Sequence, residues 1–347
     1  MNKKLAKKIS VFISIILAFF VVSNVSSVIA YSSINKRAKD IDFNITPGLI
    51  NYEEIKEILP RMEYTYKSQD ETLCGYFYKT NDKAPLVVIS GGYNSPADSL
   101  LNYHKYFVEQ GFNVFAYDNS GTGKSSGIQN GFVQPLIDLK STLEFINQNE
   151  ELTYMKTLLF GYSAGGFASA AIFNFGHYDV FASASIEGYN DGYNLMMDVA
   201  FEKAGLLVHA GLPAINILQS KKFKEYKDCT AFNGINKYNV PIYVIHNKQD
   251  DVVSYDRNSI YFSLFADSYN IKNKNTKRAL YNIKPNHEAI LYSQEALEYQ
   301  KEVNETLRKI RKYEDKKAYV STVDDEKYSQ ANSHLINTVI DFYKNYI

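Results

Sequence analysis

The sequence has no tryptophan, only two cysteines and no excess of charge of either sign. Two cysteines are too few for a disulfide framework, and the spacing of Cys74 and Cys229 is not that of a metal site, although one bridge could form in an oxidising compartment. Lysine plus arginine and aspartate plus glutamate both total 38. This balance implies no basic surface, so we expect no nucleic-acid partner.

The first 30 residues have the pattern of an export signal. Four lysines precede an apolar run from Val11 to Val22, after which serine and asparagine dilute the hydrophobicity. Small residues at Val28 and Ala30 fit cleavage after Ala30, which would secrete the protein. The stretch is also long enough to stay as a membrane anchor with the lysines inside. Either way the body is expected outside the cytoplasm, behind a stalk and short helix at residues 31–60.

Beyond residue 60 the hydrophobic pattern alternates between the periods of strands and helices. The expected strands are 62–66, 72–78, 86–90, 113–117, 156–161, 180–186, 241–246 and 278–283, and the expected helices are 97–110, 135–148, 164–175, 195–206, 254–268, 292–313 and 333–346. The first two strands form an antiparallel start, and the rest predict βαβ units with a mostly parallel sheet. Residues 61–347 are therefore expected to form one α/β domain.

Residues 189–240 interrupt this alternation. A helical stretch at 195–206 is followed by a segment without clear periodicity up to Tyr238. We interpret the insertion as a small helical lid over the carboxyl edge of the sheet. Its apolar side chains could line an acyl pocket or only pack the lid on the body; they are Met196, Met197, Val199, Leu206 and Leu207.

The pentapeptide Gly-Tyr-Ser-Ala-Gly at residues 161–165 lies between a predicted strand and a predicted helix. Such a turn is so tight that a Cβ at either glycine position would clash, and it holds the serine in a strained, exposed conformation. This context predicts that Ser163 is a nucleophile.

A serine nucleophile needs a general base, and the base needs a carboxylate that fixes its tautomer. Asp250 follows the strand predicted at 241–246, and His287 follows the last predicted strand. Carboxyl ends of parallel strands share one edge of the sheet, so the two side chains can meet Ser163 there. The chain order Ser163, Asp250, His287 is the order found on α/β-hydrolase sheets.

With these residues the chain resembles the α/β-hydrolases, in the group that includes prolyl-oligopeptidase-like and prolyl-aminopeptidase-like peptidases and many esterases. The resemblance covers about residues 60–347 and is carried by the segments 86–92, 111–126, 161–165 and 242–253 and by His287. It implies an α/β-hydrolase fold, with Ser163 as nucleophile, His287 as general base and Asp250 as orienting acid, and it implies no cofactor and no metal.

An acyl-transfer site also needs backbone donors for the oxyanion. The resemblance implies the amide of Ala164 as one donor. The other comes from the loop after the third strand, where relatives usually have His-Gly and this chain has Ser90-Gly91-Gly92-Tyr93. The second donor is therefore Gly92 or Tyr93. Asp118, Gly121 and Gly123 are interpreted as a structural turn, because the lysine and hydroxyl residues of a phosphate loop are missing.

Other residues compete weakly for these roles. Asp251 is adjacent to Asp250 and is expected to be a solvated loop residue, and His334 lacks a preceding strand and is expected on a helix surface. His246 is expected to make a structural hydrogen bond. The remaining histidines, His104, His177 and His209, are expected on helix surfaces or in the lid.

The sequence therefore predicts an exported serine hydrolase that acts on a small-molecule ester, thioester or amide. Esterase activity is favoured over peptidase activity, because no separate specificity domain is visible. A different class stays open, since a fold does not guarantee a function: a membrane-anchored binding protein without turnover. The charged extension from Glu302 to Lys317 is expected to be a solvated helix rather than a partner surface.

Overall fold

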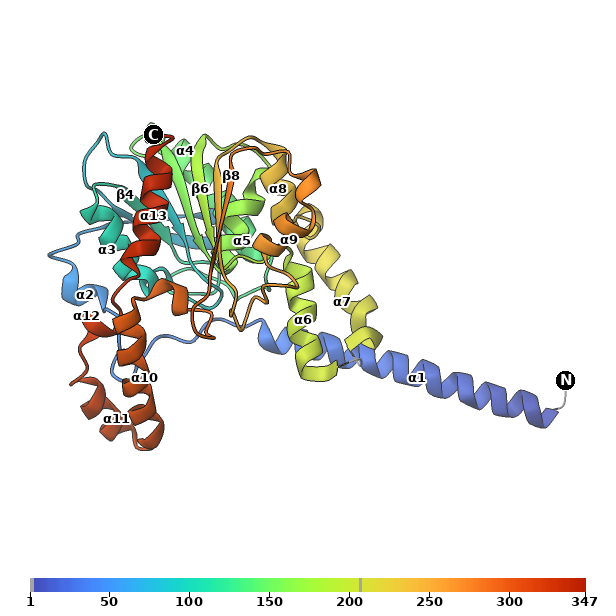
Figure 1. The fold of residues 1–347 in the computed structure, drawn as a ribbon. Coiled ribbons are helices and arrows are strands. Elements are labelled where there is room, and N and C mark those ends of the chain that lie inside the picture. Colours follow the sequence, from blue (N-terminus) through green and yellow to red (C-terminus); the bar gives the residue numbers. More distant parts are fainter. Residues whose placement is uncertain (1–2, 206–207) are drawn as a thin grey trace.

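The computed structural model describes residues 3–205 and 208–347, and within them eight strands form one sheet in the order β1-β2-β4-β3-β5-β6-β7-β8 (Figure 1). The strands are β1 (Met62–Ser68), β2 (Glu71–Tyr78), β3 (Leu86–Ser90), β4 (Asn113–Tyr117), β5 (Thr157–Tyr162), β6 (Val180–Ile186), β7 (Ile242–Asn247) and β8 (Thr276–Tyr281). The pairs β1–β2 and β2–β4 are antiparallel and all others are parallel. The predicted mostly parallel sheet with an antiparallel start is confirmed.

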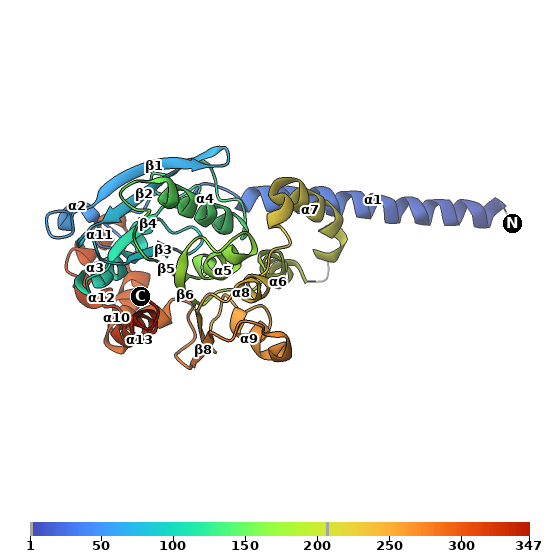
Figure 2. The same cartoon turned by 90° about the horizontal axis from the view of Figure 1, so that it is seen from above.

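Helices cover both faces of this sheet (Figures 1 and 2). One face carries α4 (Gln134–Gln148), α5 (Ala164–Ala171), α8 (Ala231–Lys237) and α9 (Ile260–Ala266), and the other carries α3 (Leu101–Glu109) and α13 (Ser333–Lys344). Alternate residues of β3 supply the two cores, with Leu86 and Val88 on the α5 side and Val87 and Ile89 on the α3 side. Burial on both sides explains why these strands are continuous apolar runs.

The inserted segment is more helical than the sequence indicates. It contains α6 (Gly192–Ala204), α7 (Val208–Phe223) and α8, where an irregular segment is expected to Tyr238. Gly211 and Pro213 weaken the helical signal of α7, because both residues lower helix propensity. Packing against a distant helix stabilises α7 instead, as described below. Leu206 and Leu207 lie outside the described residues.

The N-terminal helix α1 (Lys3–Ile34) extends beyond the predicted 30 residues. The following segment lies along the body instead of standing free as a stalk: the Ala38 amide donates to Gly121 O at 2.8 Å, and Arg37 donates to Ser125 O at 2.6 Å. Its short helix α2 (Tyr52–Ile55) precedes β1. Hydrogen bonds to the turn at 119–126 thus fix the chain as it leaves α1.

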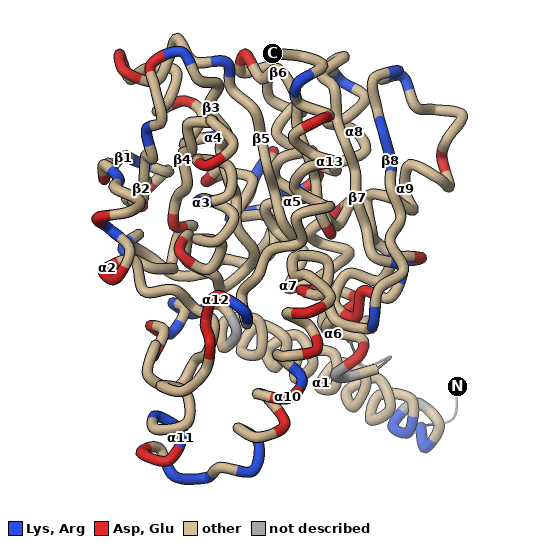
Figure 3. The backbone as a smooth tube through the Cα atoms, turned by 60° about the vertical axis from the view of Figure 1, so that its left-hand side comes forward, with Lys and Arg blue, Asp and Glu red and all other residues tan. Residues whose placement is uncertain are grey.

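The C-terminal region projects from the body before it returns to the sheet as α13 (Figure 1). It consists of α10 (Gln294–Lys309), α11 (Tyr313–Val320) and α12 (Asp325–Tyr328), so two short helices lie between the helices predicted at 292–313 and 333–346. Figure 3 shows lysine, arginine and acidic residues interspersed on α10 and α11. Mixed charge on projecting helices agrees with a solvated surface.

Candidate active site

Ser163 occupies the turn between β5 and α5 and has a left-handed backbone, with φ of 56°. A Cβ on Gly161 would lie 2.1 Å from Gly165 O, and one on Gly165 would lie 1.9 Å from Ser90 O. Only glycine fits these two positions, so the sequence motif follows directly from the closeness of the turn to its neighbours. The turn holds Ser163 partly exposed at the carboxyl edge of the sheet.

The structure brings the three predicted side chains into one hydrogen-bonded row. His287 Nε2 lies 2.7 Å from Ser163 Oγ, and His287 Nδ1 lies 2.8 Å from Asp250 Oδ2. Asp250 lies in the loop after β7, and His287 lies in the loop after β8, so both approach from the carboxyl edge. Both contacts are within the range of strong hydrogen bonds.

Asp250 is held by its own loop as well as by the histidine. Its Oδ1 accepts hydrogen bonds from the amides of Val252 and Val253 at 2.8 and 2.9 Å. Burial alone would raise the pKa of Asp250, but hydrogen bonding with His287 and the attraction of its ring keep the pKa below the usual value. The carboxylate therefore stays ionised and faces the ring nitrogen that it orients.

Asp251 has a different role from Asp250. Its Oδ1 accepts the backbone amide of His287 at 2.8 Å and does not point to the imidazole ring. It therefore fixes the loop that carries the histidine. Asp251 is an exposed loop residue, as expected, and its carboxylate is in addition tied to the loop of His287.

A buried pair behind Asp250 is absent from the sequence-based prediction. Glu187, at the end of β6, is fully buried with φ of 51°, and its Oε2 lies 3.1 Å from His246 Nδ1. His246 Nε2 lies 3.0 Å from Val253 O, which agrees with the expected structural hydrogen bond. An acidic residue directly after a buried apolar strand at the catalytic edge was the signal that could have identified Glu187.

Burial favours the neutral forms of both Glu187 and His246. Burial and the negative charge of Asp250 raise the pKa of Glu187 well above its usual value. Burial lowers the pKa of His246 to about 4, so its ring is neutral near pH 7. Protonated Glu187 hydrogen-bonds Asp250, which avoids two adjacent buried negative charges.

Donor atoms of Glu187, His246 and Asp250 lie within 4.8 Å of one another, which raises the question of a metal ion. Each residue already has a protein partner: Asn247 N donates to Glu187 at 3.1 Å, and the other two are bonded as described. Asp250 also cannot leave His287 without opening the row. The arrangement fits a hydrogen-bond network better than a metal site.

Replacing Glu187 with glutamine should remove a pH-dependent loss of stability. The unfolded glutamate releases its proton near pH 4.5, whereas the folded one keeps it, so stability falls as pH rises above that value, by at most about 1.4 kcal/mol per unit. His246 has the opposite effect only below about pH 6.5. Thermal melts of detergent-solubilised protein at pH 7 and pH 9 should therefore show a smaller decline for Glu187→Gln than for wild type. Equal declines would refute the buried neutral carboxyl.

The predicted oxyanion donors lie beside the serine. Ala164 begins α5, and Gly92 and Tyr93 line the same pocket as Ser163. A Cβ on Gly92 would be only 3.7 Å from the Ser163 Cβ. The Gly165 amide donates to Gly91 O at 3.0 Å and so ties the two loops together. The backbone of this region is thus held close to the place where an oxyanion would form.

The pocket over Ser163 has a volume of about 260 Å³ and a largely apolar lining. Phe132, Tyr189 and Leu195 supply its wall, and Val252 and Glu288 lie on the histidine side. Leu195 comes from α6, so the lid contributes directly to the pocket. Met196 is buried and in contact with Gln219 of α7, which assigns it to lid packing.

The other predicted residues fall away from this row. His334, His177 and His209 are exposed as expected, whereas His104 is fully buried in α3, where burial lowers its pKa to about 3. Its neighbours on the α3 face are aromatic, which a single helix pattern does not show. Cys74 and Cys229 are both buried, and within the described chain neither forms a disulfide.

The segment 118–126 is the structural turn that was expected. Asp118 accepts hydrogen bonds from Ala97 N at 2.7 Å and Tyr76 Oη at 2.6 Å. A Cβ on Gly123, whose φ is 44°, would lie 2.2 Å from the Asp118 carboxylate. The glycines therefore make room for a buried carboxylate that organises the loop.

Comparisons with known proteins agree with this architecture. Residues 81–186 match the family model described as serine aminopeptidase, S33. A polyketide transferase of Gibberella fujikuroi is 27% identical over 114 residues, or 31% of this chain and 36% of the relative, and one of Aspergillus fumigatus is 32% identical over 95 residues, or 26% and 32%. The chain thus matches about a third of the length of these curated relatives.

Among solved structures, the Pyrococcus furiosus esterase Pf2001 superposes with a TM-score of 0.53 at 15% identity, over 69% of this chain and 89% of that one. The α/β hydrolase GrgF from a Penicillium species superposes with a TM-score of 0.51 at 16% identity, over 83% and 99%. At these identities the likeness establishes a shared fold.

Proposed function

We propose that this chain, which has the α/β-hydrolase fold, is a serine hydrolase that cleaves carboxylic esters through an acyl-enzyme on Ser163. The observation that carries the proposal is the continuous row Ser163–His287–Asp250, with contacts of 2.7 and 2.8 Å. Each member has the contact that its role requires, so the row favours turnover over the alternative of a binding protein that has lost its chemistry.

In the proposed mechanism His287 Nε2 takes the proton of Ser163 as Oγ attacks the carbonyl carbon. Ionised Asp250 holds the ring in the required tautomer and stabilises the imidazolium that forms. The amide of Ala164, with that of Gly92 or Tyr93, stabilises the negative carbonyl oxygen. His287 then returns the proton to the leaving alcohol, and water releases the acyl group by the same steps.

The lining of the pocket supports an acyl ester substrate. Aromatic and aliphatic side chains dominate the wall, and apolar surface of this kind binds an acyl chain through removal of water. Two curated relatives are named polyketide transferases, which agrees with chemistry on an organic acyl substrate in this proposal. The test is a series of p-nitrophenyl esters from acetate upward: kcat/KM should rise with chain length until the pocket is filled, and a flat series would contradict an acyl pocket.

Peptidase activity is the second candidate, and one observation favours it. Glu288 contributes an acidic side chain to the rim of the pocket beside His287, where it could bind the free amino group of a peptide. Glu288→Gln should then raise KM for aminoacyl p-nitroanilides by about two- to fivefold, the range of an exposed ion pair, and leave neutral esters unchanged. If aminoacyl substrates are not cleaved at all, only the esterase proposal stands.

We also propose a location for the protein, at a membrane and facing outward. Lys3–Ser33 is long and apolar enough to cross a membrane, by length and composition, and four lysines mark the end that would stay inside. We place the hydrolase body outside the cytoplasm on this basis. Flotation of membranes on a density gradient would test membrane attachment. Protease added to intact cells should digest the body if it lies outside, and protection of the body would contradict this orientation.

A further inference from the structure

Helices α1 and α7 pack side by side in the same direction, although almost 200 residues separate them in sequence (Figures 1 and 2). Asn24 Nδ2 donates to Ala210 O at 2.9 Å, and the Ala214 amide donates to Asn24 Oδ1 at 3.0 Å. Further along, Gln219 Nε2 donates to the Tyr31 hydroxyl at 2.8 Å. We call this contact, made by residues 23–31 of α1 and 210–219 of α7, the anchor–lid seam.

Close approach at Gly211 makes the seam specific. A Cβ on Gly211 would lie 1.8 Å from Ser27 Oγ, so only glycine allows this separation of the two helices. Small residues that let backbones approach and polar side chains that bond across are typical of helix pairs in membranes. The serine and asparagine residues that dilute the apolar run of α1 therefore have a structural role at the seam.

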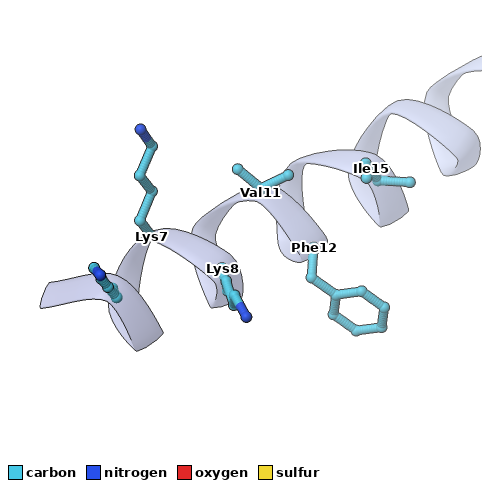
Figure 4. Close-up of a pocket in the computed structure, with 6 residues that line it drawn as sticks. Lys7, Lys8, Val11, Phe12 and Ile15 are labelled. Carbon is cyan, nitrogen blue, oxygen red and sulfur yellow. The ribbon is translucent and has the colours of Figure 1, made fainter. Parts of the chain in front are cut away.

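The distribution of charge positions the seam relative to a membrane. Figure 4 shows Lys7 and Lys8 followed by the apolar side chains of Val11, Phe12 and Ile15, and the sequence carries no charge between Lys8 and Lys36. A hydrocarbon core of about 30 Å takes about 20 helical residues, so a span that starts directly after Lys8 ends near residue 28. The outer boundary of the membrane therefore falls within the seam.

The first part of α7 is compatible with this position. From Val208 to Ser220 it has no charged residue, and Ile217 is 56% exposed in the isolated chain. Because α7 runs parallel to α1, its N-terminal end and the end of α6 are the parts of the lid nearest to the membrane (Figure 2). Phe201 of α6, 45% exposed, lies in this part.

The seam also continues to the catalytic pocket. Gln219 contacts Met196 Sδ at 3.5 Å, next to the pocket residue Leu195. A Cβ on Gly131 would lie 3.2 Å from the Tyr31 hydroxyl, and the Gly131 backbone hydrogen-bonds Tyr93 of the oxyanion loop. The end of α1 thus touches both the lid and the wall of the pocket.

We propose that α1 is retained as a membrane anchor and holds the α6–α7 hairpin at the outer surface of the bilayer, so that the pocket takes acyl esters from the membrane. The proposal rests on the esterase function proposed above. Cleavage after Ala30 would remove Asn24 and Ser27 and leave Gly211 without its partner. The contacts of the anchor–lid seam therefore favour a protein that keeps α1 over one that is cleaved after Ala30.

Adjacent serines of α1 offer a matched test. Ser27 faces Gly211, whereas Ser26 is exposed away from α7. Ser27→Leu and Ser26→Leu add the same apolar side chain, but only the first must separate α1 from α7. Full-length protein would be reconstituted in vesicles of phosphatidylethanolamine and phosphatidylglycerol, with 4-methylumbelliferyl palmitate in the bilayer and 4-methylumbelliferyl butyrate in water.

Ser27→Leu should lower turnover of the palmitate at least tenfold and change turnover of the butyrate less than threefold, whereas Ser26→Leu should match wild type on both. Equal rates of the two variants on the palmitate would overturn the proposal. A similar gain or loss on both esters in Ser27→Leu would also overturn it, because the seam would then act on the site without regard to the membrane. If wild type cleaves neither ester, the esterase proposal itself fails.

Two further measurements keep the result interpretable. The mass of the membrane-bound protein must include residues 3–30, and a product that begins at Tyr31 would overturn retention of the anchor. A cysteine pair at Asn24→Cys and Ala214→Cys should form a disulfide on mild oxidation, whereas Ser26→Cys with Ala214→Cys should not. Equal crosslinking of both pairs would show that the helices are not docked as described.

Discussion

Replacing Ser163 with alanine is expected to lower kcat for a soluble ester by roughly 10⁵- to 10⁶-fold, the size of loss that follows removal of a triad nucleophile. The physical reason is that no other side chain in the row can form the acyl-enzyme, while the oxyanion donors and the pocket remain. Steady-state hydrolysis of p-nitrophenyl butyrate measures the effect.

The same variant should keep its fold, because the strained turn is held by Gly161 and Gly165 and not by the hydroxyl. Its thermal midpoint should therefore stay close to that of wild type. A folded Ser163→Ala protein with a tenth or more of the wild-type rate would show that Ser163 is not the nucleophile.

The second large effect is expected at Asp250. Asparagine at this position keeps the volume but favours the wrong tautomer of His287, and a change of this kind lowers kcat by about 10⁴-fold. The neighbouring Asp251→Asn is the matched control, because an amide oxygen can still accept the His287 backbone amide that Asp251 now binds. The decrease in kcat for Asp251→Asn should stay below about tenfold, which corresponds to the free energy of one neutral hydrogen bond.

The pH dependence of kcat for the wild type, compared with that of the two variants, would complete this test. Asp250 has a lowered pKa, so the carboxylate should stay ionised, and wild-type activity should not report its protonation until the pH is below the usual range of a carboxyl group. If Asp251→Asn loses as much activity as Asp250→Asn, the assignment of the orienting acid is wrong.

Local sequence patterns predict most of the sheet. The strands at 113–117 and 180–186 have the predicted bounds, because both are largely buried on the two faces of the sheet and limited by glycine or charged residues. The predicted α/β-hydrolase fold is confirmed by the sheet and by the superposed structures. The motif at 161–165 predicts its own turn: Gly161 is required by a contact inside the motif, with Gly165 O, and Gly165 by a contact with Ser90 O at the end of the neighbouring strand β3.

Features set by distant contacts are the ones that the sequence does not predict. Helix α7 is missed because its signal contains Gly211 and Pro213, and its stability depends on α1, far away in the chain. The segment predicted as a stalk instead lies on the body, because residues 36–38 bond residues 121–129, far away in the chain. The buried Glu187–His246 pair joins the ends of β6 and β7. The position of each residue in the sequence therefore does not show that the two side chains meet.

These contacts connect the proposed chemistry with the proposed location. Tyr31 lies in the last turn of α1, where it reaches the lid through Gln219 and approaches the loop of Tyr93 through Gly131. The helix that the sequence predicts as an export signal or a membrane anchor therefore contacts the lid and the segment beside the pocket. Its removal should alter the lid even where the triad stays intact.

The most direct test of the central claim is covalent labelling of the full-length protein with a fluorophosphonate, followed by peptide mapping of the adduct. The account predicts one adduct on Ser163 in wild type and no labelling in Ser163→Ala or His287→Ala, because only a serine activated by the histidine attacks the phosphorus. Folded wild-type protein that stays unlabelled, or an adduct on another residue, would contradict it.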